Sequence, residues 1–585
     1  MAAALRCREL TVNRTMPTTG TGVDFGPLTR FAPALTIAVL VGPILFGFLG
    51  TFLPAFGYLP GLGGMEFTFS HLQELTGIPG IWRSVALSLA TGLVTTLISL
   101  LLLVLFVGGH LGGRLFALMR RLLAPLLAVP HAAAAFGLAF LIAPSGEIAR
   151  LISPWLSGWA RPPDLFIVHD PLGLSMIAGL VVKEIPFLFL VTLAALPQVP
   201  HSDGMRLGRS LGYGRVASFT YLVWPSLYRQ IRLAVLAVLA YATSVVDVAL
   251  ILGPQLPATL PVRLIEWMND PDLSMRYLAS AGALLQLLTT LAAIVIWLGL
   301  ERVGSGLVAA FRQRGRRLVR DGAGRNLGLG GVALAAFSIL AGIVILALWS
   351  VAGLWQFPDA LPSTLTGRSW MRAIPRLTEP LTVTLVVATL SAGLAVLLTL
   401  LCLERENETR NTGGTRALML LYLPLIVPQI SFLFGMQYFA ILGGLDGSLS
   451  GMVLAHLVFV LPYVFLSLSD PWRSYDKRYE TIAAGLGMGR VRTVFSIRLP
   501  MLSRAILTAF AVGFAVSIGQ YLPTVMIGAG RLTTVTSEAV ALSAGGNRRA
   551  IGVYAFLQTV LPFLAFAIAT ALPGLLFRNR RGLRV

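Results

Sequence analysis

Long apolar stretches recur along the whole chain and are separated by short polar loops. Ten of them are almost free of Asp, Glu, Lys and Arg, and two more carry isolated charges. A helix needs roughly 20 predominantly apolar residues to cross a bilayer, and each stretch is long enough. The pattern therefore predicts an all-α polytopic membrane protein with about twelve transmembrane helices. The predicted spans lie near 31–65, 84–116, 122–146, 172–196, 233–253, 277–300, 326–357, 380–403, 417–445, 447–469, 505–530 and 550–577.

Composition excludes a set of water-soluble domains. The 585 residues are 56% hydrophobic and 12% charged, whereas soluble proteins carry about 25% charged residues. The net charge of +20 comes from arginines scattered among short loops. This scatter indicates membrane topology and contact with the cytoplasmic leaflet, because nucleic-acid binding would favour one basic stripe.

The basic loops also predict the orientation. With the N-terminus inside, most of the 45 Lys and Arg residues fall in cytoplasmic loops, as the positive-inside rule requires. We therefore expect an inner-membrane protein with both termini in the cytoplasm. Cys7 and Cys402 would lie on that reducing side, so no disulfide is expected. Met16 is an alternative start to Met1.

The two halves of the chain carry the same loop motif. Gly212 is followed by Pro225, and Gly487 is followed by Pro500, with equal spacing and an offset of 275 residues. Both motifs fall in the long cytoplasmic loop after the fourth span of their half. The chain therefore contains an internal repeat.

A second correspondence lies upstream in each half. Val-Pro at 129–130 and Phe-Gly at 136–137 match Val-Pro at 427–428 and Phe-Gly at 434–435, at an offset of 298. Six spans in each half return the chain to its starting side, so the repeats are expected to be parallel. The predicted organisation is a tail at 1–30, a first six-span repeat at 31–300, an Arg-rich cytoplasmic linker at 301–326, a second repeat at 327–577 and a tail at 578–585.

The second loop resembles the EAA loop of the permeases of binding-protein-dependent ABC importers. That pattern reads Glu-Ala-Ala, three residues, Gly, nine residues, Ile, one residue and Leu-Pro. Both loops keep the distances from the glycine onward. They depart at Glu-Ala-Ala, which is Thr-Ile-Ala at 481–483 and Arg-Leu-Gly at 206–208, and the first loop has Trp-Pro at 224–225 in place of Leu-Pro.

The resemblance implies that each loop forms a short coupling helix docking onto a homodimeric ABC ATPase. Glycine suits the turn because it tolerates positive φ, and proline suits the first turn of the next helix. The arginines could pair with carboxylates of the ATPase, or could instead set the topology of a generic helix–turn–helix. The candidate coupling residues are Arg209, Leu211, Gly212, Arg215, Pro225, Glu480, Ala483, Leu486, Gly487, Arg490 and Pro500.

Catalytic motifs are missing from the sequence. A phosphate-binding loop needs Gly-Lys-Ser/Thr, but the two lysines, Lys183 and Lys477, precede Glu184 and Arg478. The six histidines show no metal-ligand spacing. We therefore expect a transport subunit, not an enzyme, with no bound cofactor or metal. The resemblance implies that ATP and Mg²⁺ bind the separate ATPase and that a periplasmic binding protein delivers the solute.

A few polar residues fall inside predicted spans. Lys183 and Glu184 lie mid-span in the fourth, Asp247 in the fifth and Gln520 in the counterpart of the fifth. Intramembrane ionisable groups are costly and are candidates for a transport pathway. Adjacent residues on a helix diverge by about 100°, so Lys183 is predicted to pair with Asp247. The alternative is a structural ion pair between packed helices. His456 is expected to be a buried hydrogen-bonding residue.

Two other classes of membrane protein remain as alternatives. An ion-coupled secondary transporter could also have six-plus-six helices, and a membrane-embedded enzyme would need paired catalytic groups. Both permease halves in one chain resemble the iron(III)- and thiamine-type branch of the importers. Residues 247–253 and the Arg-rich segment 578–584 are similar to its thiamine transport subgroup. The solute is left open between thiamine and iron(III).

Overall fold

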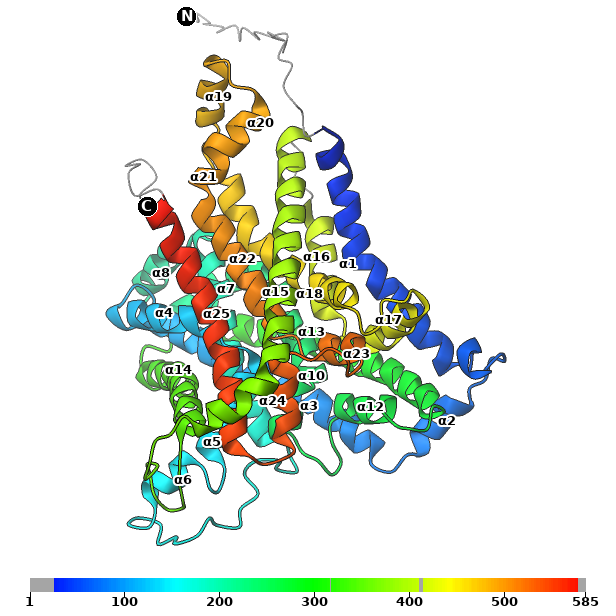
Figure 1. The fold of residues 1–585 in the computed structure, drawn as a ribbon. Coiled ribbons are helices and arrows are strands. Elements are labelled where there is room, and N and C mark those ends of the chain that lie inside the picture. The colour runs from blue at the N-terminus through cyan, green and yellow to red at the C-terminus, as the bar shows by residue number, and fades with distance from the viewer. Residues whose placement is uncertain (1–25, 316, 410–413, 577–585) are drawn as a thin grey trace, which may run out of the picture.

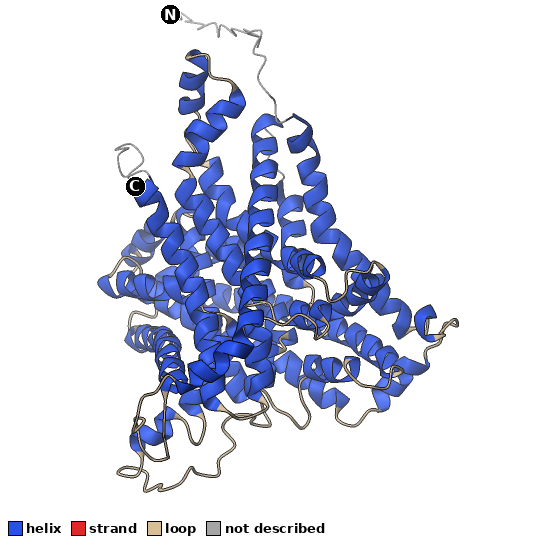
Figure 2. Cartoon of the chain, in the orientation of Figure 1, coloured by secondary structure: helices blue, strands red, loops and turns tan. Residues whose placement is uncertain are grey.

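The computed structural model describes residues 26–315, 317–409 and 414–576. Within these ranges every regular element is a helix, apart from three isolated β-bridges (Figure 2). This confirms the all-α fold class. Residues 1–25 of the predicted N-terminal tail, which include Cys7 and Met16, and the predicted tail 578–585 lie outside the described residues.

The chain has two successive series of helices. The first comprises α1 (Gly26–Ala55), η1 (Pro60–Leu62), α2 (Ser70–Gly77), α3 (Ile81–His110), α4 (Arg114–Leu126), α5 (His131–Ile142), α6 (Glu147–Ile152), α7 (Leu174–Ala195), η2 (Leu196–Gln198), α8 (His201–Ser210), α9 (Arg215–Ser218), η3 (Phe219–Val223), α10 (Trp224–Ser244), α11 (Asp247–Leu252), α12 (Leu260–Met268) and α13 (Met275–Gln313). The second comprises α14 (Gly322–Val351), α15 (Arg368–Thr409), α16 (Gly414–Ile426), α17 (Ile430–Leu442), α18 (Leu449–Arg473), α19 (Arg478–Gly485), α20 (Arg490–Thr493), η4 (Val494–Arg498), α21 (Leu499–Met501), α22 (Ser503–Ile518), α23 (Leu522–Gly528), α24 (Val535–Ser543) and α25 (Arg548–Leu576).

Among the described residues, ten helices are long and apolar enough to cross a membrane, or up to twelve if each of two bent pairs forms one span. One pair, α16 and α17, bends by 92°. Pro428 lies at this break and cannot donate a helical hydrogen bond. The stretch predicted at 417–445 is therefore a bent pair of helices that counts as one candidate span. The charge pattern does not reveal this break, because residues 427–429 are uncharged.

The fifth span of each half is also interrupted. In the first half α10 ends at Ser244 and α11 begins at Asp247; in the second, α22 ends at Ile518 and α23 begins at Leu522. In the second half the chain bends by a further 72° between Met501 and Ser503. The apolar stretches at 233–253 and 505–530 thus form broken helices. Breaks inside a protein-lined interior leave backbone polar groups available to line a pathway.

The first helix of each half packs on the other half. Helix α1 contacts α15, α16, α17 and α18, and α14 contacts α3, α4, α5 and α7. Figure 1 shows α1, in blue, beside α16 and α17 of the second half. The two halves are therefore interlocked, and each buries its opening helix against its neighbour.

Glycines permit the closest of these crossings. A Cβ atom on Gly50 of α1 would lie 2.6 Å from Cα of Gly435 in α17. At the matching crossing, a Cβ atom on Gly137 of α5 would lie 2.8 Å from Cα of Gly342 in α14. Small residues allow helix backbones to approach closely inside a membrane. The repeated Phe-Gly pairs of the sequence thus mark the two places where an exchanged helix is held.

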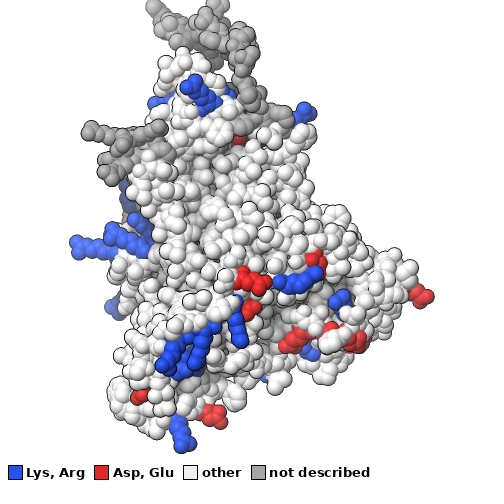
Figure 3. Space-filling model, viewed as in Figure 1, with Lys and Arg blue, Asp and Glu red and all other residues white. Residues whose placement is uncertain are grey.

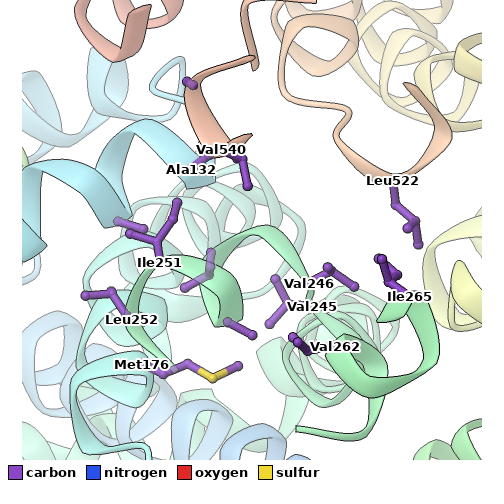
Figure 4. Packing of buried hydrophobic residues seen from close by; sticks show 14 of the residues in the cluster. Ala132, Met176, Val245, Val246, Ile251, Leu252, Val262, Ile265, Leu522 and Val540 are labelled. Atoms are coloured by element: carbon purple, nitrogen blue, oxygen red, sulfur yellow. The ribbon is translucent and has the colours of Figure 1, made fainter. Parts of the chain in front are cut away.

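The main hydrophobic cluster joins both halves. It contains Ala132 and Val246 of the first half together with Leu522 and Val540 of the second (Figure 4). These side chains come from α5, the start of α11, α23 and α24, so the broken helices of both halves meet in this cluster.

The linker predicted at 301–326 is mostly helical, because α13 continues to Gln313 and α14 begins at Gly322.

Candidate functional site

The two repeated loops have the same backbone geometry. Each consists of a short helix, a glycine turn, a four-residue helix and a five-residue π-helical turn, and the last two elements begin and end at positions offset by 275 residues. The φ angles are +80° at Gly212 and +78° at Gly487, in the left-handed region predicted for these glycines. A side chain with a Cβ is strained in this region.

The turn closes the short helix with a pair of backbone hydrogen bonds. In the second loop the N–H of Met488 donates to Ala483 O at 3.0 Å, and that of Gly487 donates to Ala484 O at 3.0 Å. In the first loop the N–H of Tyr213 donates to Gly208 O at 3.0 Å. This is the Schellman arrangement, which satisfies carbonyls at a helix end. Ala483 therefore contributes to the turn through its backbone.

Proline follows the π-helical turn in both loops. Pro225 lies in the first turn of α10 and Pro500 in the first turn of α21, where sequence reasoning had placed them. A proline inside a continuous helix removes a hydrogen bond and clashes with the preceding turn. The wider π turn just before it relieves that clash and lets the chain enter the next helix.

Apolar side chains project from both short helices into solvent. Leu211 is 49% exposed and Leu486 is 77% exposed. Leu207 beside the first, and Ile482 beside the second, are exposed as well. Neighbouring exposed aliphatic side chains on a loop that carries many arginines are typical of a protein-docking surface.

The second loop is fixed by a buried ionic network. The Arg498 side chain is 2% exposed, and its Nη1 lies 2.8 Å from Glu404 Oε2 and 3.2 Å from Glu480 Oε1. Arg490 Nη2 lies 2.8 Å from Glu404 Oε1. The Arg498 guanidinium also lies 4.1 Å from the ring centroid of Trp472. Glu480 and Arg490, two of the candidate coupling residues, thus form ion pairs within this chain.

Tyr475 lies at the edge of this network, 5.2 Å from the Arg498 guanidinium. Burial raises the pKa of its hydroxyl, and the Glu480 carboxylate raises that pKa further. The tyrosine therefore stays neutral and contributes its ring face to the arginine.

The first loop replaces this network with apolar residues. By the offsets of 298 and 275 residues, Phe106, Val223 and Met205 stand where Glu404, Arg498 and Glu480 stand in the second half. Phe106 and Val223 belong to one buried cluster, and Met205 packs against it. Arg215, the counterpart of Arg490, donates from Nη2 to Leu111 O at 2.8 Å. The two loops thus share a backbone conformation and differ in the side-chain contacts that stabilise it.

The intramembrane polar residues do not pair as predicted. Lys183 is buried, and its Nζ donates to Leu127 O at 3.0 Å and lies 3.4 Å from Leu126 O, at the C-terminal end of α4. The predicted pair with Asp247 is wrong, because a helix C-terminus offers carbonyls that attract a cation. Glu184 instead bonds His131 at 3.2 Å.

A group of titratable residues gathers where the halves meet. The His131 ring packs on Tyr241, with centroids 4.7 Å apart. Asp247, the first residue of α11, lies within electrostatic range of His131 and of Tyr521, which is on the second half. Gln520 lies next to Tyr521 in the break between α22 and α23. Sequence reasoning missed His131, which follows the repeated Val-Pro pair directly.

His456 has the structural place expected for it. It is 1% exposed, and its ring nitrogens lie 2.8 Å from Ser517 Oγ and 3.0 Å from Thr524 Oγ1. Within the described ranges of the chain, no group of three His, Cys, Asp or Glu residues could hold a metal ion.

Comparison with known proteins decides the family. The profile of the binding-protein-dependent transport system inner membrane component matches residues 410–579, which contain the whole second loop. The inner membrane ABC transporter permease protein YnjC of Escherichia coli is 32% identical over 461 residues, covering 78% of this chain and 82% of that protein. The chain belongs to this family of ABC transporter permeases.

Other relatives match over shorter stretches. A probable molybdenum ABC transporter permease protein of Haloferax volcanii is 28% identical over 228 residues, which is 37% of this chain and 78% of that protein. A spermidine/putrescine transport system permease protein PotC homolog of Mycoplasma pneumoniae is 28% identical over 134 residues, which is 23% of this chain and 46% of that protein. The protein is a multi-pass permease subunit of an ABC importer.

The second loop of the permease is held in place by residues that the sequence motif does not specify. Glu404 ends the second predicted span of its half, and Arg498 lies in the π turn, 94 residues away. Glu404 begins a charged segment with Arg405, Glu406 and Glu408, where a single acid looks like an ordinary solvated charge. A usable signal was Arg498 within an otherwise apolar segment, because a buried arginine demands a carboxylate.

Proposed function

We propose that this chain carries both permease halves of the importer, at 31–300 and 327–577, joined by the linker 301–326. The loops at α8 and α19 would each dock on one copy of an ABC ATPase homodimer at the cytoplasmic face. The observation that carries the proposal is the repeated loop, with left-handed glycines at matching positions and exposed leucines in both copies. Both termini would be cytoplasmic, in the inner membrane.

The ATPase would bind ATP and Mg²⁺ and drive the halves between inward- and outward-open arrangements. A periplasmic binding protein would deliver the solute to the outer loops. The chain itself would act without a bound cofactor. The interlocked helices α1 and α14 support a concerted motion of the two halves, because each half packs around the first helix of the other.

We propose a cationic solute, thiamine or iron(III). Two carboxylates, Glu184 and Asp247, lie near the contact between the halves and outnumber Lys183, which donates to the α4 carbonyls and lies within electrostatic range of Glu184. Carboxylates along a pathway favour cations over an oxyanion such as molybdate. Purifying the permease with its natural binding protein and identifying the bound ligand tests this assignment; a bound oxyanion would overturn it.

Replacing Gly487 and Gly212 together by valine is expected to weaken the docking of both loops on the ATPase. Left-handed backbone strain of about 1–3 kcal/mol per site would distort both docking helices. We expect permease-stimulated ATPase activity and solute uptake to fall roughly tenfold or more, measured in proteoliposomes containing the ATPase and binding protein.

Gly489→Val is the matched control, because Gly489 has negative φ and no atom within 4 Å of an added Cβ. Its ATPase stimulation should stay near that of the unaltered protein. Full uptake by the double variant would contradict the docking role. Uptake driven by an ion gradient without any ATPase would point instead to a secondary transporter.

A further inference from the structure

A basic cavity lies beside the first loop. It has a volume of about 520 Å³ and is bounded by α4 with the preceding turn on one side and by α8 with the start of α9 on the other. One water occupies about 30 Å³ of liquid, so the space can hold a phosphate group with its shell of solvent. Figure 3 shows basic side chains projecting at the left edge of the molecule, on the side where Figure 1 places α4 and α8.

The charged side chains lining the cavity are cationic. They are Arg120, Arg206, Arg209 and Arg215, joined by His201. Only Arg206 has an ion-pair partner among the described residues, Asp203 at 2.7 Å. The buried Nε of Arg215 has no hydrogen-bond partner among the residues that the structure describes. Clustered guanidinium groups repel one another, so an anion that they share would stabilise the site.

The second half does not repeat this set of residues in its sequence. By the offsets of the repeat, Leu418, Thr481 and Ala484 stand where Arg120, Arg206 and Arg209 stand in the first half, and Asp476 stands where His201 does. The remaining counterpart, Arg490, is paired with Glu404. The cluster is therefore no general requirement of a coupling loop. The cluster belongs to the half whose loop has no counterpart of the Glu404 network. A bound anion would supply there the negative charge that Glu404 supplies in the second half.

The position of α4 favours a lipid as the source of the anion. The helix directly follows the spanning helix α3, from which Gly112 turns the chain with φ +76°. Leu115 and Leu118 are exposed on α4 and are flanked by Arg114 and Arg121. A helix that exposes both leucine and arginine suits the headgroup region of a bilayer. Arginines bind phosphate through paired N–H groups.

We propose that the cavity between α4 and α8 binds the phosphate group of an anionic phospholipid and that this lipid braces the first coupling loop. The proposal rests on the proposed function only for placing the loop at the inner face. Basic pockets beside the cytoplasmic ends of spanning helices are a known setting for anionic headgroups.

The test uses the full-length permease alone, in nanodiscs of phosphatidylcholine with or without phosphatidylglycerol. The anionic lipid is expected to raise the thermal unfolding midpoint, and native mass spectrometry should find it retained. The double variant Arg120→Gln with Arg209→Gln removes two exposed side chains and should fold. Retention of phosphatidylglycerol should weaken roughly tenfold or more, and the rise in midpoint should disappear.

Arg312→Gln with Arg314→Gln is the control, because it removes the same charge from exposed linker positions. An equal loss of lipid in the control would overturn the site, since it would show non-specific attraction. Full protection by inorganic phosphate in detergent, with no further rise from the lipid, would overturn the lipid assignment. Unchanged lipid retention in the cavity variant, with weaker ATPase association, would show that ATPase carboxylates occupy the cavity. No arm needs transport, so the outcome is independent of the solute, and the lipid arms are independent of the ATPase.

Discussion

Gly50→Leu is expected to prevent the permease from folding into its interlocked form. The added Cβ would meet Cα of Gly435 at 2.6 Å and its carbonyl oxygen at 2.9 Å, and both belong to backbone that cannot move aside alone. Overpacking of this kind costs about 3 kcal/mol or more, since the clash is with backbone. We expect a large loss of monodisperse protein in fluorescence-detected gel filtration and a much lower unfolding midpoint for what remains.

Gly42→Leu provides the matched control on the same helix. No atom lies within 4 Å of a Cβ added at Gly42, so this variant should fold normally. Gly342→Leu should resemble Gly50→Leu, because its Cβ would meet Cα of Gly137 at 3.0 Å at the equivalent crossing. A fully stable Gly50→Leu protein would show that α1 does not pack on α17 as described.

Glu404→Leu should be the most damaging single change to the ionic network that holds the second loop. It leaves the Arg498 charge, 2% exposed, with Glu480 as its remaining carboxylate at 3.2 Å. Removing one partner of a buried pair costs about 3–5 kcal/mol, because the other charge loses its compensation. The measurement is the unfolding midpoint in detergent, together with ATPase stimulation. Glu406→Leu, which breaks a more exposed pair with Arg473, should cost no more than about 1 kcal/mol.

The first half supplies a rescue for this variant. Glu404→Phe, Glu480→Met and Arg498→Val together would transplant the apolar residues found at Phe106, Met205 and Val223. Well-packed apolar groups can replace a buried ionic cluster at little cost. The triple variant should therefore regain most of the stability lost by Glu404→Leu. A triple variant less stable than the single one would mean that the two loops are not structural equivalents.

The proposed lipid and the ionic network would serve the same end. Under the proposed function each coupling loop would transmit force from the ATPase, so each would need a stiff link to its spanning helices. The second loop obtains this from Arg498 between Glu404 and Glu480. The first obtains part of it from apolar packing around Val223, and the lipid would neutralise the arginines beside it. Duplicated halves can thus diverge in side chains while keeping one backbone.

The sequence by itself determined that the chain lies in a bilayer, where its apolar spans fall, and that its loop motif is repeated. Apolar runs long enough to cross a bilayer leave few alternatives, because every backbone polar group in lipid must be satisfied within a helix. Gly212 and Gly487 were assigned a left-handed turn, since spacing and glycine chemistry are local properties. The wider π turn before Pro225 and Pro500 was not foreseen, although the prolines themselves were placed correctly.

Only the tertiary structure decided which distant residues meet. Lys183 was expected to find Asp247, yet the nearer carbonyls of Leu126 and Leu127 hold it. The Glu404–Arg498 pair joins residues 94 positions apart, and the Gly50–Gly435 crossing joins opposite halves. Such contacts depend on how helices cross, and hydrophobicity cannot specify crossings when lipid tails are as apolar as the helices. Close packing and buried polar pairs choose the arrangement, and these exist only once the chain has folded.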